Sequence, residues 1–202
     1  YRITGNPRFV ETLEKVAFNA LPAQTTDDYM TRQYFQQVNQ INVMERESNF
    51  DVNHSGLDGC FGLLTGFPCC TSNMHQGWPK FTQNLWYATP DGGLAATVYS
   101  PSSVRTRVAG GVDVKISEMT KYPFEEMVTF RIDEMSRNTE FPFVVRIPSW
   151  SVKTSVKVNG KEIFDVANVD NLLTVKRKWK KGDVMELSFT PQVRLTLWKE
   201  NA

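Results

Sequence analysis

The chain has 202 residues, of which 41% are hydrophobic and 22% are charged, and this composition is typical of a folded globular protein. It excludes a disordered or collagen-like chain. The 23 lysines and arginines against 22 aspartates and glutamates give a formal charge of +1, which offers no electrostatic basis for binding nucleic acid or an anionic membrane. No stretch reaches the roughly 18 apolar residues that a membrane span needs.

Residues 1–90 are predicted to be helices and loops. Asn6 is a candidate N-cap, and apolar residues then recur every three or four positions, which predicts a helix from about Pro7 to Ala20 that ends before Pro22. A second helix is expected over Asn73–Trp86. Because two helices cannot bury a core by themselves, this part is expected to be the tail of a larger helical domain.

Residues 91–202 are predicted to form an antiparallel β-sandwich of the jelly-roll type, since runs rich in Val, Thr, Phe and Ile alternate with turn residues. Asn159-Gly160 between two such runs predicts a hairpin with a type I′ turn. The expected strands are Leu94–Tyr99, Val112–Met119, Met127–Ile132, Phe141–Ile147, Ser155–Val158, Leu172–Lys176, Val184–Phe189 and Val193–Leu197.

The chemistry of the chain is concentrated at Cys69 and Cys70, next to the start of the second predicted helix. A helix N-terminus lowers the pKa of a thiol, and a thiolate is both a nucleophile and a zinc ligand. A zinc site needs three or four protein ligands, and no Cys-x-x-Cys or His-x-x-x-His spacing supplies the remainder. The alternative is that the two cysteines are small apolar residues of a core.

Several other polar groups are weaker candidates. Glu45 and Glu47 form a possible carboxylate pair for glycosidic acid–base chemistry, although a solvated loop is favoured over it several-fold. His54 and His75 are the two histidines, and such residues more often have a structural role. The basic run Lys176–Lys181 is interpreted as a solvated strand edge that discourages pairing with another sheet.

Three stretches together resemble the beta-L-arabinofuranosidase-like glycoside hydrolases of family 127 and its relatives. They are Arg2–Phe9 running into Glu14–Ala23, then Tyr34–Gln40, and then Phe67–Phe81 with the sequence FPCCTSNMHQGWPKF. The β half is also similar to the region that follows the catalytic domain in this family, at Gly110–Val112 and Arg146–Trp150.

The resemblance implies an (α/α)6 helical barrel, of which residues 1–90 would be the tail, followed by the β-sandwich of residues 91–202. It also implies a retaining glycosidase with a cysteine nucleophile held on zinc by one Glu and three Cys. Carried over by motif, Cys69 is the nucleophile and a metal ligand, Cys70 is its neighbouring metal ligand, and Gln37 and His75 contact the substrate. The other ligands and the acid/base Glu would lie upstream of Tyr1.

The expected function is therefore a portion of a zinc-dependent hydrolase that acts on plant-type glycans, secreted or periplasmic, with no nucleic-acid or membrane partner. The 202 residues alone are expected to be inactive, and zinc is expected in the intact parent, while its binding to this chain alone stays open. The alternatives are a non-catalytic carbohydrate-binding or accessory β-sandwich module with inert cysteines, and a structural interaction domain.

Overall fold

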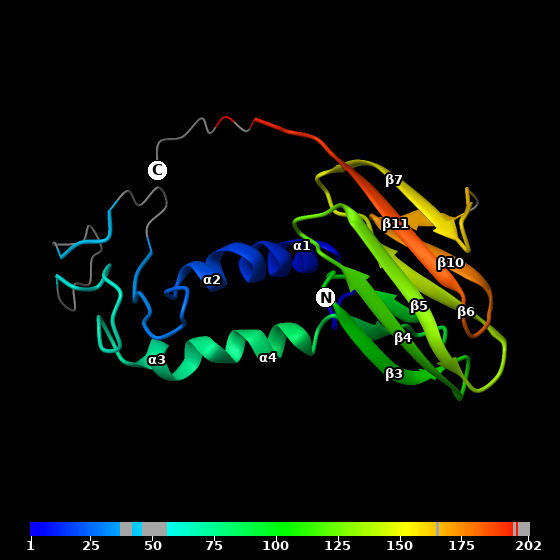
Figure 1. The fold of residues 1–202 in the computed structure, drawn as a ribbon, viewed down its shortest axis with the longest axis horizontal. Helices are drawn as coiled ribbons and strands as arrows, with labels where there is room; N and C mark the ends of the chain where they lie inside the picture. Colours follow the sequence, from blue (N-terminus) through cyan, green and yellow to red (C-terminus); the bar gives the residue numbers. More distant parts are fainter. Residues whose placement is uncertain (37–41, 46–55, 165, 196, 198–202) are drawn as a thin grey trace. The chain divides into compact units, whose positions relative to one another are not determined.

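The computed structural model describes residues 1–36, 42–45, 56–164, 166–195 and 197 (Figure 1). The contacts within the chain divide it into two compact units. The β unit comprises Tyr1–Glu11 and Leu85–Ala202, and the helical unit comprises Thr12–Asn84. The first eleven residues therefore pack with the strands, whereas they were predicted to belong to the helical part, residues 1–90. No helix in the described part of the chain is long and apolar enough to cross a membrane.

The first helical stretch begins with α1 (Arg8–Lys15) and continues through a π-helical turn, η1 (Val16–Ala20), into the short helix α2 (Leu21–Ala23). The expected cap is present, because the Oδ1 of Asn6 accepts a hydrogen bond from the Arg8 N–H at 3.0 Å. The stretch does not end before Pro22 as predicted. The Leu21 N–H bonds to the Val16 carbonyl, five residues back, and this wider turn accommodates a proline that has no N–H of its own.

The second helical stretch consists of α3 (Cys69–Asn73), a 3₁₀ turn η2 (Met74–Gln76) and α4 (Gly77–Thr82). It begins four residues earlier and ends four residues earlier than the predicted helix Asn73–Trp86. The two stretches of the helical unit pack through an edge-to-face contact of Phe18 with Phe81, whose ring centroids are 5.7 Å apart.

The described strands of the β unit form two sheets, one of five strands and one of six. The order is β1-β2-β6-β10-β9 in the first sheet and β3-β4-β5-β11-β7-β8 in the second. The pairs are antiparallel except β2 with β6, which is parallel and departs from the all-antiparallel prediction. The bounds are β1 Trp86–Ala88, β2 Leu94–Ala96, β3 Ser102–Val108, β4 Val112–Thr120, β5 Met127–Met135, β6 Thr139–Arg146, β7 Ser151–Val158, β8 Lys161–Glu162, β9 Ala167–Val169, β10 Leu172–Trp179 and β11 Val184–Pro191.

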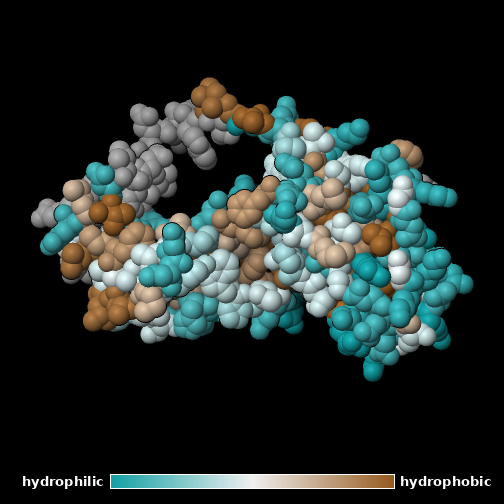
Figure 2. Space-filling view, viewed as in Figure 1, coloured by the Kyte–Doolittle hydropathy of each residue, from teal (hydrophilic) through white to brown (hydrophobic). Residues whose placement is uncertain are grey.

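The core of the β unit lies between these two sheets. Along β4 buried residues alternate with exposed or half-buried ones, as expected for a strand with one face in the core. Phe130 of the second sheet contacts Trp86 and Phe143 of the first, with ring centroids 5.7 and 5.1 Å apart. The sandwich prediction is therefore confirmed. The opposite face of β3, β4 and β5 is largely hydrophilic (Figure 2) and carries ion pairs such as Arg105–Glu134.

Two local features predicted from the sequence, a hairpin and a C-terminal strand, have opposite outcomes in the structure. The Asn159-Gly160 hairpin is confirmed, since β7 pairs with β8 and both turn residues have positive φ, 53° and 76°. The predicted strand Val193–Leu197 is wrong over its described residues, which form no strand and leave Val193 fully exposed. An apolar alternation does not make a strand without a partner edge.

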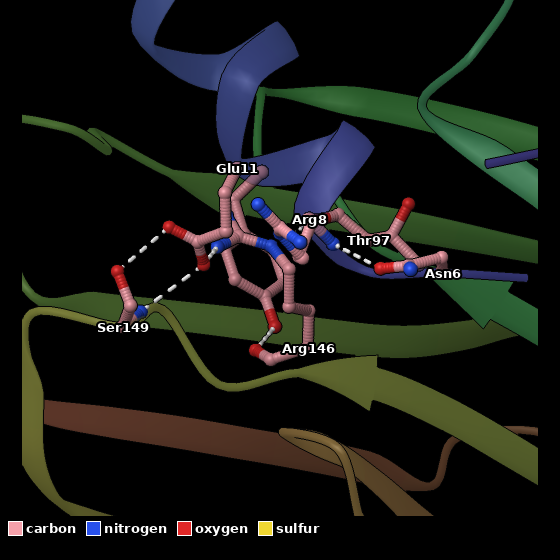
Figure 3. Close-up of polar contacts among 7 residues, drawn as sticks. Asn6, Arg8, Glu11, Thr97, Arg146 and Ser149 are labelled. Carbon is pink, nitrogen blue, oxygen red and sulfur yellow. Dashed lines mark hydrogen bonds and ion pairs between the residues drawn. The ribbon is translucent and has the colours of Figure 1, made fainter.

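A buried ion pair joins α1 to β6 within the β unit (Figure 3). Arg146 is completely buried, and its guanidinium donates to the carboxylate of Glu11 and to the carbonyl of Thr97. The same carboxylate accepts the N–H of Ser149 at 3.1 Å and its hydroxyl at 2.9 Å. A buried charge is tolerated only when it is paired and hydrogen-bonded, so this contact fixes the first turn of α1 on the sandwich.

Candidate active site at the paired cysteines

The paired cysteines form the first turn of α3, directly after Pro68. Their sulfur atoms are 3.9 Å apart, both thiols are free, Cys69 is exposed and Cys70 is half-buried. The alternative that the pair is simply part of a core does not hold for this arrangement. An exposed thiol next to a partly buried one is accessible to a ligand on one side and supported on the other.

Arg32 holds the loop that leads into this turn. Its side chain is buried, and its guanidinium donates to the carbonyls of Thr65 at 2.5 Å and Phe67 at 3.0 Å. Its Nε donates to the hydroxyl of Thr71 at 3.0 Å, and that hydroxyl donates to the carbonyl of Leu63 at 2.6 Å. One side chain thus fixes the backbone on both sides of the cysteine pair.

Gly66 is required in this loop by its backbone and by its surroundings. Its backbone φ is +66°, a conformation that residues other than glycine rarely adopt. A Cβ at this position would also overlap the ring of Tyr34. The close approach of the loop to Tyr34 therefore depends on the absence of a side chain, three residues before Cys69.

The thiol environment differs from the sequence expectation. Burial raises the pKa of the Cys70 thiol, and the hydrogen bond and charge of Cys69 raise it further, while Arg32 opposes them. This direction is opposite to the lowering that the sequence predicted from the start of the helix. A neighbouring cation is then needed to keep both sulfurs as thiolates at neutral pH.

The separation of the two sulfurs suits a shared zinc ion. Two thiolates at about 2.3 Å from one tetrahedral zinc lie about 3.8 Å apart, close to the 3.9 Å observed. The pair supplies two donors, and the described residues contain no cluster of three or more His, Cys, Asp or Glu that could hold a metal. The chain therefore fits half of a closed zinc site.

Of the remaining sequence candidates, the structure describes His75, Cys60 and Glu45. His75 is exposed in η2, and within the described chain no hydrogen bond or ion pair joins it to either cysteine. Cys60 is half-buried, and Glu45 is exposed. The predicted substrate contact Gln37 lies outside the described residues, as do Glu47 and His54.

Two residues of this site were missed by sequence reasoning, Arg32 and Thr71. Arg32 is 37 positions from Cys69 in a polar stretch without periodicity, and no spacing marks it as buried. Thr71 directly follows the two cysteines, and its hydroxyl is the one local feature of the sequence that could have indicated a contact at this turn.

The β unit matches a known family. Residues 93–191 match the model described as beta-L-arabinofuranosidase, GH127 middle domain. Among solved structures, a GH127 beta-L-arabinofuranosidase from Geobacillus stearothermophilus T6 aligns with 93% of this chain at a TM-score of 0.77 and 20% identity. A protein described as a glycoside hydrolase aligns at 0.74 and 21%, and a GH127 beta-arabinofuranosidase at 0.68 and 22%, each again over 93% of this chain.

At these identities the solved structures establish similarity of fold. The chain spans less than a third of each of them, at 29%, 30% and 29% of their lengths. A search of curated proteins found no significant match. Residues 93–191 nevertheless match the glycoside hydrolase family 127 middle-domain model, so the family resemblance predicted from the sequence is confirmed for this part of the chain.

Proposed function

We propose that this chain carries the nucleophile of a retaining glycoside hydrolase, with Cys69 as the attacking residue. The observation that carries the proposal is the exposed Cys69 thiol, 3.9 Å from Cys70, on a turn held by Arg32 in a family 127 chain. Beta-L-arabinofuranosides of plant-type glycans are the proposed substrates; in support, one matched structure is described as a beta-L-arabinofuranosidase and another as a beta-arabinofuranosidase.

In the proposed reaction the Cys69 Sγ attacks the anomeric carbon of the sugar. The bond to the leaving oxygen breaks, and a carboxylic acid gives that oxygen its proton. The resulting glycosyl thioether is then attacked by water, which loses its proton to the same carboxylate, and the C–S bond breaks to regenerate the thiolate. Two displacements at one carbon give net retention of configuration.

Cys69 and Cys70 are the residues of this chain that would hold zinc. When bound, the ion would lower the pKa of both thiols and keep the nucleophile deprotonated. Cys70 would orient its neighbour, and Arg32 would keep the turn in place through the carbonyl of Phe67 and the hydroxyl of Thr71. His75 and Gln37 stay proposed substrate contacts.

The proposal requires groups that the described residues do not supply. By the family resemblance, the acid/base carboxylate and two further zinc ligands come from a stretch preceding Tyr1, and residues 1–90 are the tail of an (α/α)6 barrel. We therefore expect no turnover by the 202 residues alone. A secreted or periplasmic location is proposed on the same resemblance.

The test uses the longer protein with three single substitutions. Cys69→Ser should abolish hydrolysis of an aryl beta-L-arabinofuranoside, and Cys70→Ser should also lower the zinc content from one per chain toward none. Cys60→Ser is the matched control, because Cys60 is a free, half-buried cysteine of the same unit that the proposal does not use. Full activity in Cys69→Ser would refute the nucleophile.

The alternative of a non-catalytic carbohydrate-binding module makes the opposite prediction. Its cysteines would be inert, so the Cys69→Ser and Cys60→Ser proteins would behave alike in glycan binding, zinc content and activity. Selective alkylation of Cys69 with loss of activity would exclude it.

A further inference from the structure

A groove with basic side chains lies on the β unit, away from the cysteines in sequence. It has a volume of about 480 Å³ and is lined by Ile163, Phe164, Val175, Lys176, Arg177 and Lys178. Its lining residues in the described part of the chain combine apolar side chains with three cations. The groove includes Lys176–Lys178, the first half of the basic run that the sequence analysis interprets as a solvated strand edge.

The sheet topology explains why this groove is open. β10 pairs with β6 along its whole length but with β9 only over Leu172–Thr174. In the described part of the chain, the remainder of β10 therefore has one free edge. On the other wall, the Ile163 N–H donates to the Val156 carbonyl at 2.9 Å, and this bond anchors the backbone next to Phe164.

Phe164 presents an aromatic surface to solvent. The residue is 83% exposed, although burying a phenylalanine normally stabilises a fold. A single exposed apolar residue is unremarkable on its own. Here the ring lines a groove together with cations, and that combination suits a ligand that has both an apolar face and a negative charge.

The cations of the groove differ in their availability. The Arg177 guanidinium lies 5.1 Å from the Trp179 ring centroid and 4.0 Å from the buried carboxylate of Asp183. Lys176 and Lys178 are exposed and share the opposite face of β10, because side chains two residues apart in a strand point the same way. The Glu140 carboxylate lies 3.7 Å from Lys176, and Glu140 is also the cross-strand neighbour of Lys178 in the β10–β6 pair. The Lys176–Glu140 pair is exposed, so it is weak and a ligand carboxylate can compete with it.

We propose that this groove binds the uronate units of an acidic glycan, with the sugar's C–H face on the Phe164 ring and its carboxylates on Lys176 and Lys178. The inference rests on the proposed function, which makes a glycan the ligand of this protein. A hexuronate offers both an apolar C–H face and a carboxylate within one unit. Nucleic acid is the less favoured occupant, because phosphate-backbone binding depends on many cations along a path, and of the three cations that line this groove only Lys176 and Lys178 are exposed.

The test measures binding of an oligogalacturonate to the full chain by calorimetry at low ionic strength. The methyl-esterified form of the same oligosaccharide is the matched ligand, because it keeps the sugar faces and removes the charge. Binding of the acidic form, weakened by salt and by esterification, is the expected result.

Three variants separate the groove from general charge attraction. Lys176→Ala with Lys178→Ala should weaken binding about tenfold, the loss expected for two exposed ion pairs. Lys180→Ala with Lys181→Ala removes the same charge from the same run outside the groove and should change affinity less than about twofold. Phe164→Ala leaves the charge unchanged and should still weaken binding several-fold.

Equal losses in the two lysine pairs, an unaffected Phe164→Ala protein, or no binding of oligogalacturonate would overturn the proposal. Equally tight binding of a single-stranded RNA of matched charge would also overturn it. Hydrolysis of a small, neutral aryl arabinofuranoside by the longer protein is measured separately. Failure of the groove leaves that activity intact, and failure of the nucleophile leaves the glycan binding intact.

Discussion

Glu118 is predicted to make the stability of the β unit fall as the pH rises. Its side chain is 2% exposed on β4, where Oε1 accepts the Ser100 N–H at 3.0 Å and Oε2 lies 3.2 Å from the Ser102 hydroxyl. The Trp86 indole N–H donates to that same hydroxyl at 3.0 Å. Burial raises the pKa of Glu118 from its usual 4.5 to about 8, and the two serine contacts only partly offset this effect.

The direction follows from proton binding in the two states. The unfolded chain loses the Glu118 proton near pH 4.5, whereas the folded chain keeps it to about pH 8. The folded state therefore binds more protons between these values, and the free energy of unfolding decreases with pH across this window. At about 1.4 kcal/mol per pH unit, the decrease is on the order of 5 kcal/mol and is complete above the folded-state pKa.

Urea denaturation of the wild type and Glu118→Gln at about pH 5, 7 and 9 tests this reasoning. Glutamine resembles the protonated acid, so the two proteins should have similar stability at the lowest pH, and the variant should be the more stable at the highest. Glu134→Gln is the control, because Glu134 is an exposed residue paired with Arg105, and its replacement should matter little at any pH. Parallel pH profiles for the wild type and Glu118→Gln would refute the reasoning.

Three further predictions concern packing. Glu11→Ala removes one partner of the buried Glu11–Arg146 ion pair and should cost about 3–5 kcal/mol in urea denaturation, against about 1 kcal/mol for Ser149→Ala, which keeps that pair. An equal loss of unfolding free energy in Glu11→Ala and Ser149→Ala would contradict the importance of the buried Glu11–Arg146 ion pair. Gly66→Ala should destabilise more than Gly110→Ala, because both positions have positive φ but only the first meets a side chain, Tyr34; similar melting temperatures would show that the Tyr34 contact is unimportant. A lysine in Arg32→Lys cannot reproduce the guanidinium contacts to Thr65, Phe67 and Thr71 that hold the turn. Alkylation of the half-buried Cys70 should therefore become faster relative to alkylation of Cys60. An unchanged ratio of the two alkylation rates would mean that the turn does not depend on Arg32.

Local sequence signals predicted those parts of the fold that neighbouring residues decide. Asn159-Gly160 specifies its turn by backbone conformation alone, and Asn6 caps α1 through a side chain two residues away. The predicted end of the helix before Pro22 is wrong, because the helical stretch continues through Pro22 into α2. The π-helical turn that accommodates this proline depends on packing, and no single-residue preference predicts it.

Long-range contacts decided the rest. The cysteine motif identified the site, but the clamp by Arg32 joins residues more than 30 positions apart, and no periodicity marks it. The strand β3 was missed because its residues, SSVRTRV, are mostly polar, and it is held by pairing with β4 rather than by burial on both faces. Conversely, Val193–Leu197 has the alternation of a strand, but its described residues pair with no strand of the sandwich.

Identification of the residue that forms a covalent bond with the sugar tests the central claim most directly. The longer protein is incubated with an activated, fluorinated arabinofuranoside, which slows hydrolysis of the intermediate, and the modified residue is located by mass spectrometry. The account predicts one glycosyl group per chain on Cys69, present in Cys60→Ser and absent in Cys69→Ser. A glycosyl group on any other residue, or turnover by the Cys69→Ser protein, would contradict it.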